Sequence, residues 1–215
     1  MSTLTNTSQA RVDPGPDPRS DGEELARRKL AEGDRRAALA LLMEQYGDTV
    51  FGYCSALLRD RHQAEDMLQT VFLDAFEAMP VFGGRSSFRT WLLGIARHRC
   101  LDSLRSRTRW RRVFGATRTA DRGGDDNSAV VERVPAPAAG DEPFADPRWA
   151  PLLDDCLGNL TPSARDGVIL RFRQELSFQE IASLSGEKPG ALRVRVFRAV
   201  EALRRCLKTK GVDAL

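Results

Sequence analysis

Arginine side chains are concentrated between residues 85 and 112 of this 215-residue chain, where Asp102 is the only carboxylate. Phe82, Phe88 and Trp91 lie within or just before this stretch. Guanidinium groups bind phosphates and aromatic rings stack on unpaired bases, so this combination fits a nucleic acid. The alternative is that the aromatic side chains pack in a core and the arginines only keep the surface solvated. The arginines of this stretch are Arg85, Arg89, Arg97, Arg99, Arg105, Arg107, Arg109, Arg111 and Arg112.

A second basic stretch, between residues 188 and 210, has a helical pattern. Its apolar residues recur at three- and four-residue steps, which places them on one buried stripe of a helix. The stripe consists of Leu192, Val196, Val200, Leu203 and Leu207. Val194, Phe197 and Arg198 point away from this stripe, and Arg193 lies on its flank. Arginine binds guanine edges or phosphates and apolar groups contact thymine methyls, so this outer face fits a DNA major groove.

Two shorter helix signals precede this basic helix. Thr161 followed by Pro162 marks one helix start, and Ser177 with Glu180 has the spacing of a capping box. Gly186 then ends the second of these helices. A short helix, a tight turn and a longer basic helix together predict a helix-turn-helix. Because many helical hairpins share this pattern, the pattern alone leaves both an operator reader and a protein-binding surface open.

The segment AEDMLQTVFLDAFEAM, residues 64 to 79, predicts a helix with two unlike faces. Its apolar residues from Met67 to Met79 supply a complete buried face. Asp66, Gln69, Thr70 and Leu73 fall together on the other side. A solvated surface is the simpler interpretation of that second face, although a leucine among polar groups weakly favours a contact.

Composition divides the chain into five segments. With 41% hydrophobic residues and a formal net charge of +3, the chain has enough apolar residues for packed cores. The N-terminal stretch is rich in Ser, Thr, Pro and Asp, and it cannot offset the entropy of ordering. We therefore predict an all-α protein with a disordered tail over 1–22, a helical domain over 23–112, a flexible acidic linker over 113–149, a second small helical domain over 150–210 and a tail over 211–215.

Several classes of function find no support in the sequence. The four cysteines form no C-x-x-C pair and the two histidines have no metal-ligand spacing, so neither zinc nor disulfides are expected. No apolar run has the length of a signal peptide or a membrane span, which predicts a cytoplasmic protein without membrane insertion. No nucleophile and base stand in a recognisable motif, and no glycine loop cradles phosphates, so we expect neither an enzyme nor a cofactor. The cysteines are Cys54, Cys100, Cys156 and Cys206, and the histidines are His62 and His98.

Four segments in order resemble an extracytoplasmic-function (ECF, group IV) sigma factor of bacterial RNA polymerase, within the sigma-70 family. They are QAEDMLQTVFLDAF, FGGRSSFRTWLLGIARHRCLDSLR, LTPSARDGVILRF and LSFQEIASLSGEKPGALRVRVFRAVEAL. The resemblance covers about residues 35 to 112 and 150 to 208, and linked motifs in this order are far more specific than any one of them. It implies a sigma region 2 helical bundle followed by a sigma region 4 helix-turn-helix.

The resemblance implies two roles for the first domain. In the family the A-E-D-x-x-Q helix docks on the clamp helices of the largest polymerase subunit, which implies core polymerase contacts for Asp66, Gln69, Thr70 and Leu73. The family usually has an acidic residue where Thr70 stands. The loop before F-R-T-W-L captures a flipped base of the −10 element, and the helix behind it helps to separate the strands, with an asparagine frequent where this chain has His98. The residues implied at the −10 element are Phe82, Gly83, Gly84, Arg85, Ser86, Ser87, Arg89, Trp91, Arg97, His98 and Arg105.

In the family the last helix of the second domain reads the −35 element. The residues implied at the −35 element are Lys188, Gly190, Ala191, Arg193, Val194, Phe197 and Arg198. Members commonly have G-I-P-x-G-T-V-x-S-R in this region, whereas this chain has Ala191 for the threonine and Val194 for the serine. Glu187 also replaces an apolar turn residue. We therefore expect weaker packing at the turn unless Glu187 finds a partner.

The resemblance implies a promoter-specificity subunit as the function. Such a protein binds core RNA polymerase, recognises −10 and −35 promoter elements, promotes DNA opening, and lies on the nucleoid when bound to polymerase. The resemblance also implies an anti-sigma factor as a partner, and a linker that mimics nucleic acid inside the polymerase, for which a solvated tether is the alternative. The alternative function is a stand-alone helix-turn-helix regulator that binds an operator, but such a regulator does not need the A-E-D-x-x-Q helix.

Overall fold

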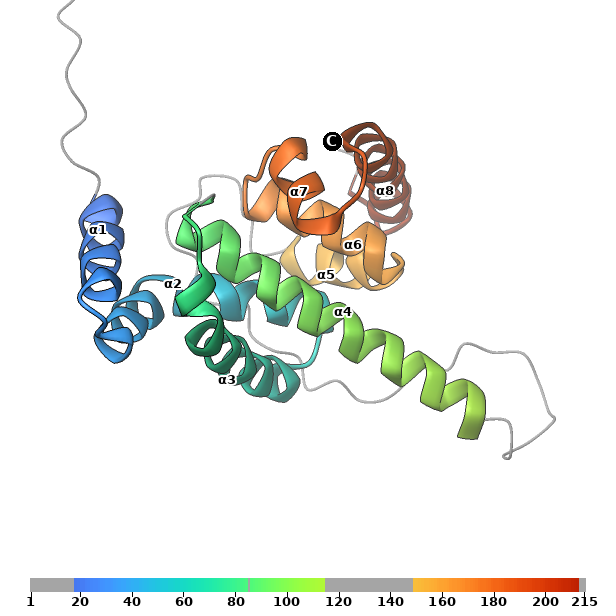
Figure 1. Ribbon diagram of the computed structural model, residues 1–215. Coiled ribbons are helices and arrows are strands. Elements are labelled where there is room, and N and C mark those ends of the chain that lie inside the picture. Colours follow the sequence, from blue (N-terminus) through green and yellow to red (C-terminus); the bar gives the residue numbers. More distant parts are fainter. Residues whose placement is uncertain (1–17, 85, 115–148, 213–215) are drawn as a thin grey trace, which may run out of the picture.

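The computed structural model describes residues 18–84, 86–114 and 149–212, and helices dominate these ranges, with no strand among them (Figure 1). The all-α prediction is therefore confirmed. The elements are α1 (Pro18–Ala31), α2 (Arg35–Leu58), α3 (Arg61–Ala78), the 3₁₀ turn η1 (Met79–Val81), α4 (Phe88–Phe114), α5 (Ala150–Gly158), α6 (Pro162–Val168), the π-helical segment η3 (Ile169–Arg173), α7 (Phe178–Ser185) and α8 (Pro189–Thr209).

Helices α1 to α4 pack as one bundle around apolar residues that repeat at helical spacing. Asp34 and Asp60 cap α2 and α3, because each carboxylate accepts a hydrogen bond from a backbone N–H of the first turn. Between these helices the chain reverses at Arg59, whose φ of 57° lies in the left-handed region. Core side chains from three helices, among them Leu42, Val71 and Leu92, are fully buried. The buried face predicted for residues 67–79 is therefore confirmed.

The predicted ends of the first domain differ from the observed helices. Helix α1 begins at Pro18, so residues 18–22, which the sequence assigns to the tail, are helical. Helix α4 continues to Phe114, beyond the predicted end at residue 112. The rest of the predicted tail, 1–17, and most of the predicted linker, 115–148, lie outside the described residues, so their flexibility stays a prediction.

Helices α5 to α8 form the second domain with the predicted caps. Thr161 accepts a hydrogen bond from Ala164 N at the start of α6, and Ser177 and Glu180 form the complete capping box of α7. Gly186 ends α7 with a φ of 69°, a conformation that glycine adopts without strain. A small core under α8 includes Ala199, Leu203 and Leu207. The helix-turn-helix prediction is confirmed.

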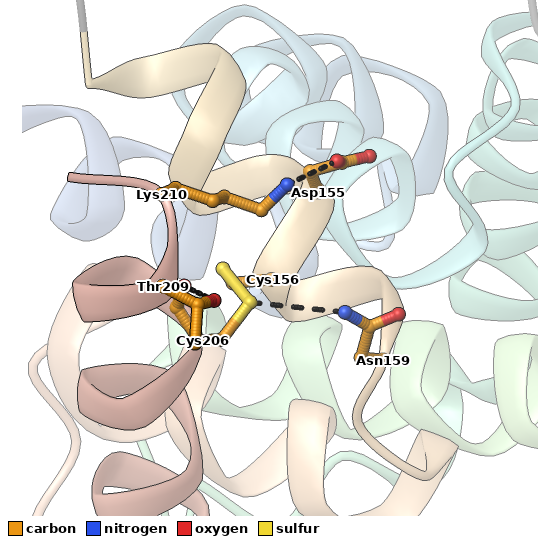
Figure 2. The surroundings of a disulfide bond; sticks show 6 residues. All are labelled: Asp155, Cys156, Asn159, Cys206, Thr209 and Lys210. Atoms are coloured by element: carbon orange, nitrogen blue, oxygen red, sulfur yellow. Dashed lines mark hydrogen bonds and ion pairs between the residues drawn. A yellow bond between two sulfur atoms is a disulfide. The ribbon is translucent and has the colours of Figure 1, made fainter.

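A disulfide within the second domain links two cysteines that are 50 residues apart in sequence. The expectation that the cysteines form no disulfide was therefore wrong. Cys156 of α5 is bonded to Cys206 near the end of α8, and Lys210 Nζ lies 2.9 Å from Asp155 Oδ2 beside it (Figure 2). Sequence spacing missed this pair because only the packing of α5 on α8 brings the two residues together. Cys54 and Cys100 are free and buried, with their sulfur atoms 3.6 Å apart.

The two helical domains pack on each other. Residues of η3, of the loop that follows it, of α7 and of α8 join the core that α2, α3 and α4 build. These residues are Ile169, Leu170, Leu176, Ile181 and Leu192. Figure 1 shows α6 and α7 on one side of α4 and α3 on the other. The helix-turn-helix therefore lies against α4, the helix that carries Arg97 and four other residues predicted to contact the −10 element.

Candidate polymerase and nucleic-acid surfaces

The predicted polymerase face lies on the open side of α3. Asp66 and Gln69 are exposed, and 67% of Leu73 is accessible to solvent, which is unusual for a leucine in a bundle that buries Val71 and Phe72 beside it. Thr70 is half-buried, and its hydroxyl donates a hydrogen bond of 2.9 Å to the backbone carbonyl of Asp66. The face therefore offers one apolar and two polar side chains, with Thr70 bonded to its own helix.

The predicted base-capturing loop precedes α4 and combines open backbone with an aromatic cluster. Gly83 and Gly84 are exposed, and Gly84 has a φ of 65°. The Phe82 ring lies 4.5 Å from the buried Phe88 ring and 4.8 Å from the Trp91 ring, between centroids. These rings pack on one another, so the core interpretation of the aromatic residues holds for Phe88. Arg85 lies outside the described residues.

Ser87 caps the N-terminus of α4. Its Oγ accepts a hydrogen bond of 3.1 Å from the backbone N of Thr90 and donates one of 3.0 Å to Thr90 Oγ1. Ser86 is half-buried beside it. Ser87 therefore holds the start of α4 by its hydroxyl, and its backbone carbonyl accepts a hydrogen bond of 3.0 Å from the backbone N of Trp91.

Helix α1 supplies residues to this region that the sequence did not single out. A cavity of about 600 Å³ is lined by Phe82, Gly83 and Phe88 together with Arg27 of α1 and Arg35 at the start of α2. The Arg27 guanidinium lies 5.6 Å from the centroid of the Phe88 ring. The cavity therefore combines ring faces with positive charge. Periodicity could not find it because Arg27 and Phe88 are far apart in sequence.

The side chains of α4 that were predicted to contact the −10 element divide between two sides of the helix. Arg89 donates a hydrogen bond of 2.9 Å to Gln174 Oε1, and Arg97 Nε donates one of 2.7 Å to Asp166 Oδ2, both in the second domain. His98 and Arg105 instead lie on an exposed side, where each pairs with Asp102, at 3.2 Å and 3.1 Å. The predicted contacts to the −10 element therefore do not all lie on one open face. No sequence pattern pointed to Gln174 or Asp166 as partners.

Asp166 is the centre of a buried polar cluster. Only 2% of it is exposed, and its carboxylate also accepts a hydrogen bond of 2.8 Å from the Tyr53 hydroxyl. Burial raises the pKa of Asp166 although Arg97 and Tyr53 oppose that shift. Burial, followed by the charge of Asp166, raises the pKa of Tyr53 well above its usual value. The cluster therefore ties α2, α4 and α6 together.

Arg165, next in the chain, satisfies helix ends in both domains. Its Nη1 donates to the carbonyl of Leu57 at 3.0 Å, and its other nitrogens donate to carbonyls at the end of α5, including that of Leu157 at 2.8 Å. Carbonyls in the last turn of a helix lack the usual helical partner, and that of Leu157 also accepts a hydrogen bond of 3.2 Å from the backbone N of Leu160. Burial, and then the charge of Arg59, lowers the pKa of Arg165 to about 10. A guanidinium here replaces the water that would otherwise bind these helix ends.

The predicted −35 face of α8 is open along its length. Half of Val194 and 65% of Phe197 are accessible, and Arg193 and Arg198 are exposed beside them. Lys188, Gly190 and Ala191 are exposed at the start of the helix. This face joins apolar and cationic groups, which is the combination that thymine methyls, guanine edges and phosphates require.

Glu187 does find a partner at the turn. Its two carboxylate oxygens accept hydrogen bonds from the two terminal nitrogens of Arg195, one of them at 2.9 Å, and Arg97 lies 3.9 Å away. The hydrogen bond from Arg195 holds the pKa of Glu187 below its usual value. An ion pair therefore takes the place of the apolar contact that family members have at this turn.

Comparison with known proteins decides the family. The sigma-70 region 2 family model matches residues 42–110, and the sigma-70 region 4 model matches residues 151–203. The sigma factor CarQ of Myxococcus xanthus is 32% identical over 77% of this chain and 87% of its own length. The ECF sigma factor SigC of Mycobacterium tuberculosis is 34% identical over 80% of this chain and 84% of its own length.

The chain belongs to the extracytoplasmic-function sigma factors of the sigma-70 family. This sigma factor is a transcription initiation factor that gives RNA polymerase its promoter specificity. In fold it is similar to the sigma factor RpoE of Bartonella quintana, solved with the anti-sigma factor NepR, with a TM-score of 0.61, 22% identity and coverage of 84% of this chain and 99% of that one. It is also similar to CnrH, solved with the cytosolic domain of CnrY, with a TM-score of 0.59, 20% identity and coverage of 90% and 100%.

Membrane-spanning helices and metal clusters are both absent from the part of this sigma factor that the structure describes. No helix there has the length and apolar character needed to cross a membrane. No group of three or more metal-ligating side chains comes together within the same ranges.

Proposed function

We propose that this sigma factor docks on core RNA polymerase through Asp66, Gln69 and Leu73 of α3, with Thr70 at the edge of the contact. The observation that carries the proposal is the exposure of Leu73 on a helix whose other face already fills the core. An exposed leucine between polar groups fits an interface with a protein, and a regulator that binds an operator alone has no use for it. The stand-alone alternative is therefore not favoured.

The −10 element is bound, in this proposal, by the loop before α4 and by α4 itself. The exposed Gly83–Gly84 backbone and the Phe82 ring support a contact with an unpaired base, since rings stack on bases without regard to their identity. His98 and Arg105 support contacts to the strand from the exposed side of α4. Arg89 and Arg97 take part only when they leave Gln174 and Asp166.

The −35 element is read by the first turns of α8. Arg193 and Arg198 supply the charge, and Val194 and Phe197 supply an apolar surface, with Val194 standing where family members commonly have serine. An apolar side chain at Val194 favours contact with a thymine methyl over a hydrogen bond to phosphate. We therefore expect this helix to prefer promoters with thymine near the centre of the −35 element.

We also propose that this sigma factor acts in the cytoplasm, on the nucleoid when it is bound to polymerase, and that it catalyses no reaction of its own. Its domains are residues 23–112 and 150–210 as the sequence predicts them, with the first extended by the observed helices to Pro18 and Phe114, and an acidic linker joins the two. An anti-sigma factor is the proposed regulator, because the similar structures of RpoE and CnrH were solved with the anti-sigma factor NepR and with the cytosolic domain of CnrY.

Promoter-dependent run-off transcription with core polymerase tests this function. Start-site mapping after expression of the protein supplies the templates, because aligned upstream sequences reveal both promoter elements. We expect transcription that depends on the added protein and stops when either element is scrambled. No stimulation over core polymerase, together with tight binding of one operator by the free protein, would instead establish the stand-alone regulator.

A further inference from the structure

The cavity beside the loop before α4 contains positive charge without negative charge. Its volume is about 600 Å³, within the range of roughly 300 to 1,000 Å³ that is usual for ligand sites. Arg27 and Arg35 line it, and no carboxylate side chain is among the described residues that do so. The other lining residues are apolar or glycine, and they include Phe82 and Phe88. The cavity therefore suits an anionic ligand that also has a flat, apolar part.

Arg35 stands where its charge does not stabilise its own helix. It is the first residue of α2, directly after the cap Asp34, and the first turn of α2 contains no acidic residue. The N-terminus of a helix carries a partial positive charge, so an arginine there is unfavourable for the helix. The Arg35 guanidinium lies 5.0 Å from the centroid of the Phe76 ring and forms no ion pair within the described ranges. Its charge is therefore available to a ligand.

Arg27 is held in position by two neighbours. Its Nη2 donates a hydrogen bond of 3.2 Å to Glu23 Oε2, and its guanidinium lies 5.6 Å from the centroid of the Phe88 ring. Glu23 in turn accepts a hydrogen bond from the Tyr46 hydroxyl. A guanidinium has five N–H donors, so the bond to Glu23 leaves most of them for a second acceptor. Because Glu23 partly neutralises Arg27, Arg35 supplies the larger share of the positive charge.

We propose that Arg35, assisted by Arg27, binds a backbone phosphate of the −10 strand beside the base that the loop before α4 captures. The proposal rests on the proposed function of that loop. Both arginines precede residue 42, where the match to sigma-70 region 2 begins, so the match assigns them no role. A nucleotide joins a flat base to an anionic phosphate, and the cavity joins aromatic rings to guanidinium groups. The arginines therefore hold the strand in position while the loop contacts the base.

Binding of a promoter fork with an unpaired −10 strand to the holoenzyme of core polymerase and the full chain tests the proposal. Arg35→Ala should weaken binding about tenfold and reduce the slope of log affinity against log salt by about 0.7. The loss should not depend on the identity of the captured base, because a phosphate contact carries no sequence information. Arg36→Ala is the matched control, since Arg36 is exposed in the same first turn but does not line the cavity. The control is expected to match the unmodified protein.

Neutral linkages in the DNA identify the phosphate that is bound. A methylphosphonate replaces one phosphate at a time along the −10 strand. We expect one position where this replacement weakens binding by the unmodified protein but not by Arg35→Ala, because the variant has already lost that contact. Arg35→Lys should keep the salt dependence, since it retains the charge, and recover only part of the affinity.

Three results would overturn the proposal. They are an unchanged affinity of Arg35→Ala for the fork, an equal loss for Arg36→Ala, and a loss of binding to core polymerase itself, which would assign Arg35 to a polymerase contact. Failure of the proposed function gives a different result. In that case the unmodified holoenzyme binds a fork with a scrambled −10 strand as tightly as the fork with the mapped one.

Discussion

Arg97 of α4 and Asp166 of α6 form an ion pair with a distance of 2.7 Å between Nε and Oδ2, although they are 69 residues apart in sequence. The pair is almost entirely shielded from water, so neither charge is well solvated without the other. Tyr53 completes the cluster from α2. Arg97, which the sequence assigns to a DNA contact, therefore helps to hold the two domains together in this structure.

Removal of one charge from this pair is expected to destabilise the protein strongly. Arg97→Met leaves the Asp166 carboxylate buried without a counter-ion, which lowers the free energy of unfolding by about 3 kcal/mol. Urea denaturation at pH 7 measures the change. The double variant Arg97→Met with Asp166→Asn is expected to recover most of the loss, because no buried charge remains. Strictly additive effects of the two substitutions would contradict this explanation.

The Glu187–Arg195 ion pair is expected to make the stability of the turn depend on pH. Arg195 lowers the pKa of Glu187 from its ordinary value of 4.5, so the carboxylate stabilises the fold at neutral pH and loses this effect as pH falls through its lowered pKa. Glu187→Gln should lower the melting temperature at pH 7, corresponding to less than about 1 kcal/mol for this partly exposed pair. The difference should shrink as the pH falls below 4.5 and should vanish at a pH low enough to protonate Glu187. A difference that persists there would exclude the ion pair as its cause.

Local sequence signals predicted the helices well and the long-range contacts poorly. The capping box of Ser177 and Glu180 depends on neighbours three residues apart, so the pattern contains all the information it needs. The bond between Cys156 and Cys206 depends on how two distant helices pack, and no spacing rule contains that information. For the same reason a motif could assign Arg97 to the −10 element, whereas its engagement by Asp166 was not predicted.

Truncation of Leu73 is expected to weaken polymerase binding without affecting the fold. Leu73→Ala removes an exposed apolar contact and should raise the dissociation constant for core polymerase about tenfold, as central interface residues do. Fluorescence anisotropy of labelled protein measures it. Met43→Ala is the matched control, since Met43 is an exposed apolar residue of α2 outside the proposed face. Equal losses for both variants would mean that α3 is not the specific contact.

Arginine substitutions in α8 are expected to separate promoter recognition from polymerase binding. Arg193→Ala and Arg198→Ala should each reduce promoter-dependent transcription about tenfold, with polymerase affinity unchanged. Arg204→Ala serves as the control because Arg204 is exposed later in the same helix, where it pairs with Glu201 at 2.8 Å. Lost polymerase binding with unchanged promoter preference would show that this face contacts polymerase instead of DNA.

Reduction of the disulfide is expected to destabilise the second domain. A cross-link that spans 50 residues restricts the unfolded chain, and the loop-entropy relation gives about 4 kcal/mol for a loop of this length. Thermal unfolding with and without dithiothreitol measures the effect. The double variant Cys156→Ser with Cys206→Ser should unfold like the reduced protein and should not respond to dithiothreitol. A response of that variant would point to the buried pair of Cys54 and Cys100 instead.

The disulfide fixes one end of α8, so a small tilt of the helix displaces its other end. Helix α8 has 21 residues and is therefore about 30 Å long, with Cys206 anchored to α5 at one end and the DNA-reading residues at the other. Gly190, at the reading end, lies about 24 Å along the helix from Cys206, so a tilt of about 5° about the anchored end moves it by roughly 2 Å, compared with a rise of about 3.4 Å between base pairs. Small changes in how α6 and α7 support this helix thus correspond to more than half of a step along the promoter.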